Sequence, residues 1–149
     1  NPAKTLKRMS VYLKKNGLIL INEPEISFFL KFLQFILDDE PWSFKVNIFN
    51  SKKNIFKSNN PWASNTAVAK LLFNDEDQFN RYFPEYKIIR NDFSEFFIFF
   101  NSGGVYNEVV YIPLNRFFLK LLDYFDSILI FFLPSIFSLN RTVILKKIK

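Results

Sequence analysis

Residues 17–24 read GLILINEP, and this stretch decides the predicted fold class. A short apolar run at 18–21 ends abruptly in Asn22, Glu23 and Pro24, and a basic helical segment comes just before it. That order is typical of a buried parallel strand, and in open α/β sheets ligands bind outside the carboxyl ends of such strands. The stretch therefore predicts an α/β protein in which Glu23 is a candidate site residue. The alternative interpretation is that Glu23 and Pro24 only terminate the strand, since Pro is a common stop signal.

The composition narrows the chemistry that the chain can perform. The 149 residues, 49% of them hydrophobic, are enough for one domain with a real core, and we predict a single domain over 1–149. The absence of Cys excludes disulfides and thiolate nucleophiles. The absence of His removes the commonest general base and metal ligand, and no metal site is predicted.

The net charge of +6 favours an anionic partner in general terms. The basic residues are spread along the chain and are not clustered with stacking aromatic residues on one element, so we do not expect a nucleic-acid partner. The amino-terminal segment is polar and basic and lacks the apolar region of a secretory signal. A cytoplasmic location is therefore expected.

Periodicity and breaker residues predict an alternation of helices and strands. Because a helical crossover separates the first two strands, we expect 18–22 to run parallel to 86–90 or its neighbour, with 142–148 antiparallel in the same sheet. The predicted helices are 2–16, 26–37, 66–73, 76–83 and 114–133, the predicted strands are 18–22, 86–90, 94–100 and 142–148, and 102–104 is a turn. The Phe- and Leu-rich helix 26–37 is expected to be mostly buried, and Gly17 is expected to end the first helix.

A long polar connection at 38–65 is predicted to be a substrate-side insertion or lid, because loops of this length are often functional. Trp62 and Asn65 are candidates for lining a substrate pocket; the alternative is that they pack the loop against the core. The acidic run at 38–40 is interpreted as a solvated turn and not as a metal site. The turn at 102–104 lacks the Lys-Ser/Thr of a phosphate-binding loop.

The predicted helix 114–133 has three possible environments. Its first half is amphipathic, and after Ser127 the polar face becomes apolar at Ile130 and Phe131. A buried core helix and a peripheral membrane contact both fit this pattern. A transmembrane span fits less well, because the uncharged stretch 127–140 contains Pro134 and is shorter than the roughly 20 residues that a bilayer requires.

The ordered series of segments resembles a known family. A helix followed by GLILINEP, then WASNTAVAKLLF, FNRYFPEYKI, FFNSGG, a long helix and a terminal VILKK strand is similar to the carboxyl-terminal half of a bacterial class I S-adenosylmethionine-dependent methyltransferase, of the methyltransferase type 11 kind. The resemblance covers essentially all of the chain. Asn16-Gly17 stands where the family has Gly-Gly.

The resemblance implies strands five to seven of a partial Rossmann-like sheet, with an antiparallel terminal strand pair. It implies S-adenosyl-L-methionine as the cofactor, held by a glycine-rich loop and an acidic residue that would lie before Asn1, so no cofactor-binding residue is assigned here and this chain alone is expected to be inactive. The methyl acceptor is unknown, and Glu23 and the 42–65 segment would border its cleft. The strand 18–22 would expose an edge where strand four belongs. The alternative is a non-catalytic module that binds a membrane or a partner through its apolar helices.

Overall fold

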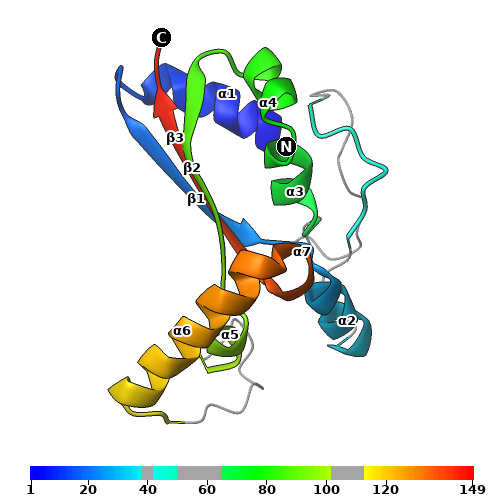
Figure 1. Cartoon of the computed structure of the whole chain (residues 1–149). Helices are drawn as coiled ribbons and strands as arrows, with labels where there is room; N and C mark the ends of the chain where they lie inside the picture. The colour runs from blue at the N-terminus through cyan, green and yellow to red at the C-terminus, as the bar shows by residue number, and fades with distance from the viewer. Residues whose placement is uncertain (38–41, 50–64, 102–112) are drawn as a thin grey trace.

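The computed structural model describes residues 1–37, 42–49, 65–101 and 113–149. These residues form a mixed α/β fold with one three-stranded antiparallel sheet and seven helices (Figure 1). The elements are α1 (Pro2–Tyr12), β1 (Leu18–Pro24), α2 (Phe28–Leu37), α3 (Val68–Phe73), α4 (Glu76–Tyr82), β2 (Tyr86–Ser94), α5 (Phe97–Asn101), α6 (Arg116–Phe132), α7 (Pro134–Phe137) and β3 (Asn140–Lys147). The predicted insertion at 38–65 falls mostly outside the described residues, as do the acidic run 38–40 and the turn 102–104.

The sheet has the strand order β1-β3-β2, so the last strand in the chain is the central one. Both β1 and β2 pair antiparallel with β3, from Leu18 opposite Lys146 to Pro24 opposite Asn140 in the first ladder. Since each is antiparallel to the same strand, β1 and β2 run in the same direction, which confirms the predicted directions of all three strands. The prediction of a buried parallel strand at 18–22 is wrong, however, because β1 is a half-exposed edge strand with an antiparallel neighbour.

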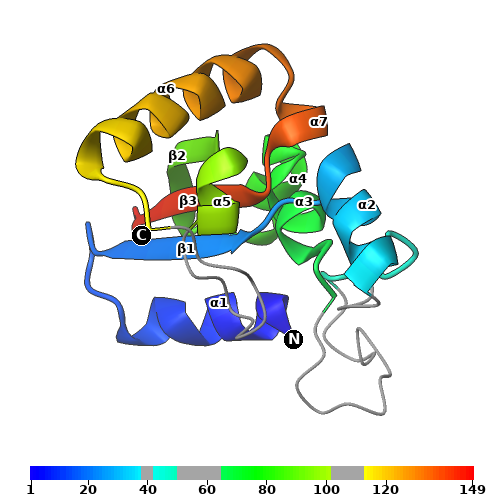
Figure 2. The same ribbon diagram turned by 90° about the horizontal axis from the view of Figure 1, so that it is seen from below.

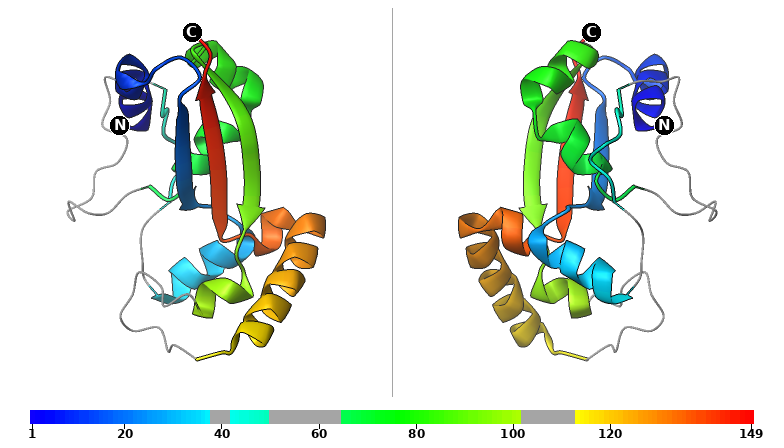
Figure 3. Two further views of the ribbon diagram at one scale, coloured as in Figure 1. Left: turned by 90° about the vertical axis from the view of Figure 1, so that its left-hand side faces the viewer. Right: turned by 90° about the vertical axis from the view of Figure 1, so that its right-hand side faces the viewer.

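One face of the sheet is covered by helices and the other is open. The helices α1, α3 and α4 contribute apolar side chains to a core that includes Val143 and Leu145 of β3, both with 0% exposure. Figure 3 shows the three strands side by side, with α1 next to the β1 edge. On the opposite face Leu18 and Leu20 are 57% and 68% exposed. The alternation of side chains along β1 thus separates a packed face from an open one.

The first helix ends earlier than predicted. α1 begins at Pro2 with Asn1 as its N-cap, whose side chain accepts a hydrogen bond from the Lys4 amide, and it ends at Tyr12. The left-handed residue of the turn into β1 is Asn16, with φ 67°, and not Gly17. A Cβ atom on Gly17 would lie 2.6 Å from Leu13 Cγ, so glycine is required there by the close approach of the preceding turn.

The separate strand predicted at 94–100 is wrong: Ser94 is the last residue of β2, and Phe97–Asn101 form the helix α5. β2 is a single strand that continues to Ser94, with a bulge between Ile88 and Arg90. Its aromatic sequence favours a strand locally, but Asp126 of α6 accepts hydrogen bonds from three successive backbone amides at the start of α5. This long-range cap satisfies the amides that a helix start leaves without partners.

A second apolar cluster lies beyond the carboxyl ends of β1 and β2, where α2, α5, α6 and α7 gather (Figure 1). Its buried members are Ile26, Leu30, Ala67, Phe96, Ile130 and Leu139. Figure 2 shows α1 beside the β1 edge of the sheet and α6 on the side of the β2 edge.

The helix α2 is less buried than the sequence predicted, and most of α6 is exposed, so α6 is not the buried core helix that was one of its possible environments. Phe35 of α2 is 86% exposed, and Asp126 and Ile130 are the buried residues of α6. The high proportion of apolar residues in these two helices therefore does not mean that they are buried. Within the described part of the chain, none of the helices combines the length and the apolar character that crossing a bilayer requires.

Candidate functional site

The carboxyl ends of β1 and β2 meet the start of β3 in a polar region. Asn22 of β1 accepts hydrogen bonds through Oδ1 from Asn140 Nδ2 and from Thr142 Oγ1, both at 2.9 Å. Ser138, just before β3, donates to the carbonyl of Asn140 at 2.9 Å. Short polar side chains thus fix the point where the chain leaves β1 and enters β3.

A buried ion pair lies next to this network. Arg141 Nη1 is 3.3 Å from Glu25 Oε2, and the two side chains are 3% and 2% exposed. The other carboxylate oxygen of Glu25 is 3.2 Å from Lys70 Nζ, which also donates to the carbonyl of Ile26. Both carboxylate oxygens are therefore engaged by cations, which is how a buried charge is accommodated.

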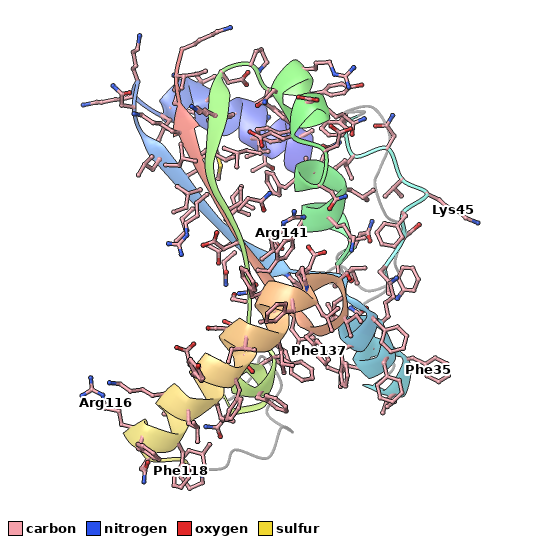
Figure 4. All side chains as sticks on the ribbon, viewed as in Figure 1. Phe35, Lys45, Arg116, Phe118, Phe137 and Arg141 are labelled. Carbon is pink, nitrogen blue, oxygen red and sulfur yellow. The ribbon has the colours of Figure 1, made fainter. Side chains whose placement is uncertain are left out.

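The guanidinium group of Arg141 in β3 contacts α3, β2 and the segment that follows β1. It donates to the carbonyls of Ala69 and Phe73 in α3, at 3.4 and 3.3 Å, and its Nε donates to Asn91 Oδ1 at 2.8 Å. The ring of Phe93 lies under the guanidinium, 4.8 Å from Cζ to the ring centroid. In Figure 4 the labelled Arg141 lies between the sheet and α3. A cation near the carboxyl end of a helix also stabilises the helix dipole.

Burial lowers the pKa of Arg141 from its usual value, and the charge of Glu25 opposes this shift. Arginine still remains protonated at neutral pH, so the guanidinium acts as a fixed positive charge. The dense set of contacts indicates a scaffold that holds the end of β1, and neither Glu25 nor Arg141 faces open space.

An open groove of about 440 Å³ runs along β1 between α1 and α3. Thr5, Leu6 and Met9 line one wall from α1, and Leu72 lines another from α3. Glu23, exposed at the carboxyl end of β1, also lines this groove. Of the acids in this region, Glu23 is therefore the one that a bound molecule in the groove would meet.

Asn65, another predicted site residue, does not line this groove. Asn65 is buried, and its Oδ1 accepts from the amides of Ser43 and Ala67, while its Nδ2 donates to the Ser43 carbonyl. These bonds connect the segment 42–49 to the start of α3. Trp62 lies outside the described residues. A role of either residue in lining a substrate pocket stays a prediction.

Part of the predicted insertion packs against the core. Ile48 is 2% exposed in the main apolar cluster, and Phe49 stacks on Tyr82 with ring centroids 4.3 Å apart. Among the described residues, no group of three or more acidic residues is arranged to hold a metal ion.

The sequence analysis missed the three charged residues that organise the site, Glu25, Lys70 and Arg141. A signal did exist for two of them. Glu25 directly follows the Pro that ends the strand, and Arg141 lies between Asn140 and Thr142, just before the apolar run of the terminal strand. Neither position reveals its partner, because the two residues are 116 positions apart.

Comparisons with protein-family models, with curated proteins and with solved structures found no match to this chain.

Proposed function

We propose that this chain is the carboxyl-terminal half of a cytoplasmic, bacterial class I S-adenosylmethionine-dependent methyltransferase. The observation that carries the proposal is the arrangement of the strands: β1 and β2 run in the same direction on either side of an antiparallel β3. In this proposal β1, β2 and β3 are strands five, six and seven, and β2 with β3 is the antiparallel terminal pair. The series of sequence segments that resembles the family supports the same assignment.

The edge of β1 fits this proposal. Among the described residues β3 is the only strand that pairs with β1, so the outer edge of β1 is available to a further strand. Its open-face residues Leu18 and Leu20 are exposed, and further covering structure would bury them favourably. The proposal assigns that position to strand four.

The described residues do not form a cofactor site of the expected kind. The cofactor loop of the family follows a strand at its carboxyl end, whereas Gly17 lies at the amino end of β1. In this proposal, S-adenosyl-L-methionine binds to the half of the domain that the resemblance places before Asn1. This chain then forms the side of the domain that binds the methyl acceptor.

On the acceptor side the chain would position the reacting group. Holding two reactants in line supplies much of the acceleration of a transfer reaction, and the buried Glu25–Arg141 pair gives the carboxyl end of β1 a fixed geometry. A hydroxyl acceptor would also need a general base. Glu23, at the groove, is the candidate for that role.

Two measurements test the proposal. The first is to sequence the DNA that precedes the codon for Asn1. An in-frame strand followed by a Gly-x-Gly turn supports the methyltransferase, and an in-frame stop codon directly before Asn1 contradicts it.

The second measurement is calorimetric titration with S-adenosyl-L-methionine. The full-length parent is expected to bind it, and so is a mixture of this chain with the separately expressed amino-terminal half. The chain alone is expected not to bind. The same titration is repeated with the E25L variant of this chain, in which the end of β1 is disturbed. The mixture of E25L with the amino-terminal half should bind less cofactor than the wild-type mixture does. Failure of the full-length parent to bind would overturn the proposal.

A further inference from the structure

The outward side of α6 is an exposed aromatic surface. Phe131, Phe132 and Phe117 are 80%, 72% and 70% exposed, and Tyr124 is 62% exposed. We call this surface the aromatic face of α6, and its rings are Phe117, Phe118, Tyr124, Phe125, Phe131 and Phe132. Contiguous exposed apolar surface of this kind marks an interaction site in a protein.

The aromatic face lies opposite the side on which α6 packs. The buried residues Asp126 and Ile130 mark the packed side. With 3.6 residues per turn, the six rings occupy a continuous sector of about 140° centred away from that side. Figure 4 shows the labelled Phe118 and Arg116 at the end of α6 that projects away from the sheet. The six rings therefore do not belong to the side of α6 that packs against the rest of the described fold.

The charges of α6 are distributed unevenly around this face. Arg116 and Lys120 are exposed, and on the helix wheel they follow the ring sector on the side of Phe131. Asp126 is 3% exposed and turned toward α5, where its carboxylate accepts the three amide hydrogen bonds. Asp123 is exposed, and it lies on the helix wheel farther from the rings than Lys120 does. The border of the aromatic face is thus basic on the side of Phe131.

We propose that the aromatic face of α6 binds the surface of a lipid bilayer that contains anionic lipids, with the helix lying in the plane of the interface. Phe and Tyr rings on one side of a helix, with basic residues at the border, are the features of an interfacial helix. Anionic head groups complement Arg116 and Lys120. This inference does not depend on the proposed methyltransferase activity.

A second copy of the chain fits this face less well. The seam between two paired helices is a narrow stripe into which side chains of each helix insert. The aromatic face is broader than such a stripe, and its rings project from a single convex helix. A bilayer interface accepts a broad, convex aromatic surface without a matching groove.

Flotation with vesicles of equimolar phosphatidylcholine and phosphatidylglycerol tests the proposal on the whole 149-residue chain. The wild type is expected to float with these vesicles and to bind pure phosphatidylcholine vesicles more weakly. The double variant F117Q/F131Q, at two exposed positions, should weaken binding by about tenfold or more, because two rings leave the interface. Its circular dichroism spectrum should be unchanged.

The matched control for the rings is V11Q/Y12Q on α1, where the side chains are 77% and 87% exposed. This control should retain wild-type binding. If it lowers vesicle binding as much as F117Q/F131Q does, binding is nonspecific and the proposal is wrong.

The charge requirement has its own pair of variants. R116Q/K120Q should reduce binding to the anionic vesicles several-fold and should flatten its dependence on salt. K14Q/K15Q removes the same charge from an exposed segment after α1 and should have a smaller effect. Equal effects of the two variants would contradict a basic border at α6.

A positive signal comes from the variant F131W. Its fluorescence should be quenched by brominated lipids in the vesicles more strongly than that of the wild type. Sedimentation velocity without lipid tests the alternative that a second copy of the chain binds the aromatic face of α6. If F117Q/F131Q abolishes self-association while the wild type ignores vesicles, the face is an interface between copies and the lipid proposal is overturned.

Discussion

Arg141 at the start of β3 and Glu25 just after β1 form an ion pair, 3.3 Å from Nη1 to Oε2, in which both side chains are almost completely buried. The pair holds the first and last strands of the chain together at the end of the sheet where the candidate groove lies. Its removal should therefore affect both stability and the geometry of the groove.

We expect R141M to lower the free energy of unfolding by about 3–5 kcal/mol, because it leaves the Glu25 carboxylate buried with one of its two cations missing. The double variant E25L/R141M should recover a large part of that loss, since both buried charges are removed together, and Lys70, whose side chain is 28% exposed, keeps its hydrogen bond to the carbonyl of Ile26. Urea unfolding followed by circular dichroism measures both. R90M is the control, because Arg90 pairs with Asp92 on the exposed surface and should cost about 0–1 kcal/mol. Equal losses for R90M and R141M would contradict this account.

The cap that Asp126 provides for α5 gives a second prediction. D126A removes the acceptor for the amides of Phe96, Phe97 and Ile98, which lie 2.9–3.0 Å from the carboxylate oxygens. Lost hydrogen bonds to a buried charged group should lower stability by about 2–4 kcal/mol. Hydrogen exchange of these three amides should speed up more than exchange in β3. D123A, at an exposed position on the same helix, should change stability by less than about 0.5 kcal/mol, and a comparable loss there would argue against the cap.

Tyr86 predicts how stability depends on alkaline pH. Its side chain is buried and its hydroxyl donates to the carbonyl of Leu6 at 3.0 Å, and burial raises the pKa of the Tyr86 phenol above its usual value of 10.0. The unfolded chain then loses this proton at a lower pH than the folded chain, so the stabilisation is present below pH 10.0 and is lost as pH rises through the folded pKa.

Y86F should be less stable than the wild type at neutral pH by about 1 kcal/mol, because it loses the hydrogen bond. Its stability should fall less steeply than that of the wild type as the pH rises past 10.0. Urea unfolding at a series of pH values measures the two slopes. Parallel slopes for the two proteins would refute the linkage.

The open face of β1 predicts self-association. Leu20 is 68% exposed on an edge strand, and exposed apolar edges promote pairing between chains. The wild type is expected to form oligomers in sedimentation velocity. L20K should lower the fraction of oligomer with little change in the unfolding midpoint. V11K, at a residue of α1 that is 77% exposed, is the matched control and should leave association unchanged. Association that persists in L20K would place the contact elsewhere.

Local signals in the sequence predicted most of the elements. The helix predicted at 76–83 is confirmed as α4, and it begins just after Asp75, whose side chain accepts a hydrogen bond from the Gln78 amide at 2.8 Å. The directions of the three strands were also predicted, because a helical crossover constrains the relation of its two flanking strands. The start of α4 depends on residues close together in the chain, and the relation of β1 to β2 depends on the segment that connects them.

The failed predictions depend on distant residues. The segment 94–100 has strand propensity, yet most of it belongs to α5 because Asp126, about 30 positions away, caps the first amides of that helix. The Glu25–Arg141 pair joins positions 116 apart. The burial predicted for α2 failed for a related reason: an apolar pattern shows that a face favours leaving water but does not show what covers it. Glu23 was placed correctly at a strand end, and its role stays a prediction.

The position of β3 has a consequence for the order of synthesis. Both ladders of the sheet run through β3, yet β3 is the last of the three strands to be translated. At about 5–20 residues per second, the segment between Ser94 and Asn140 takes roughly 2–9 s to synthesise. During that time β1 and β2 exist as nascent segments that lack the strand with which each of them pairs. A ribosome stalled in this interval would therefore display β1 and β2 without their shared partner, and these unpaired strand edges would make the nascent chain a substrate for chaperones until β3 emerges.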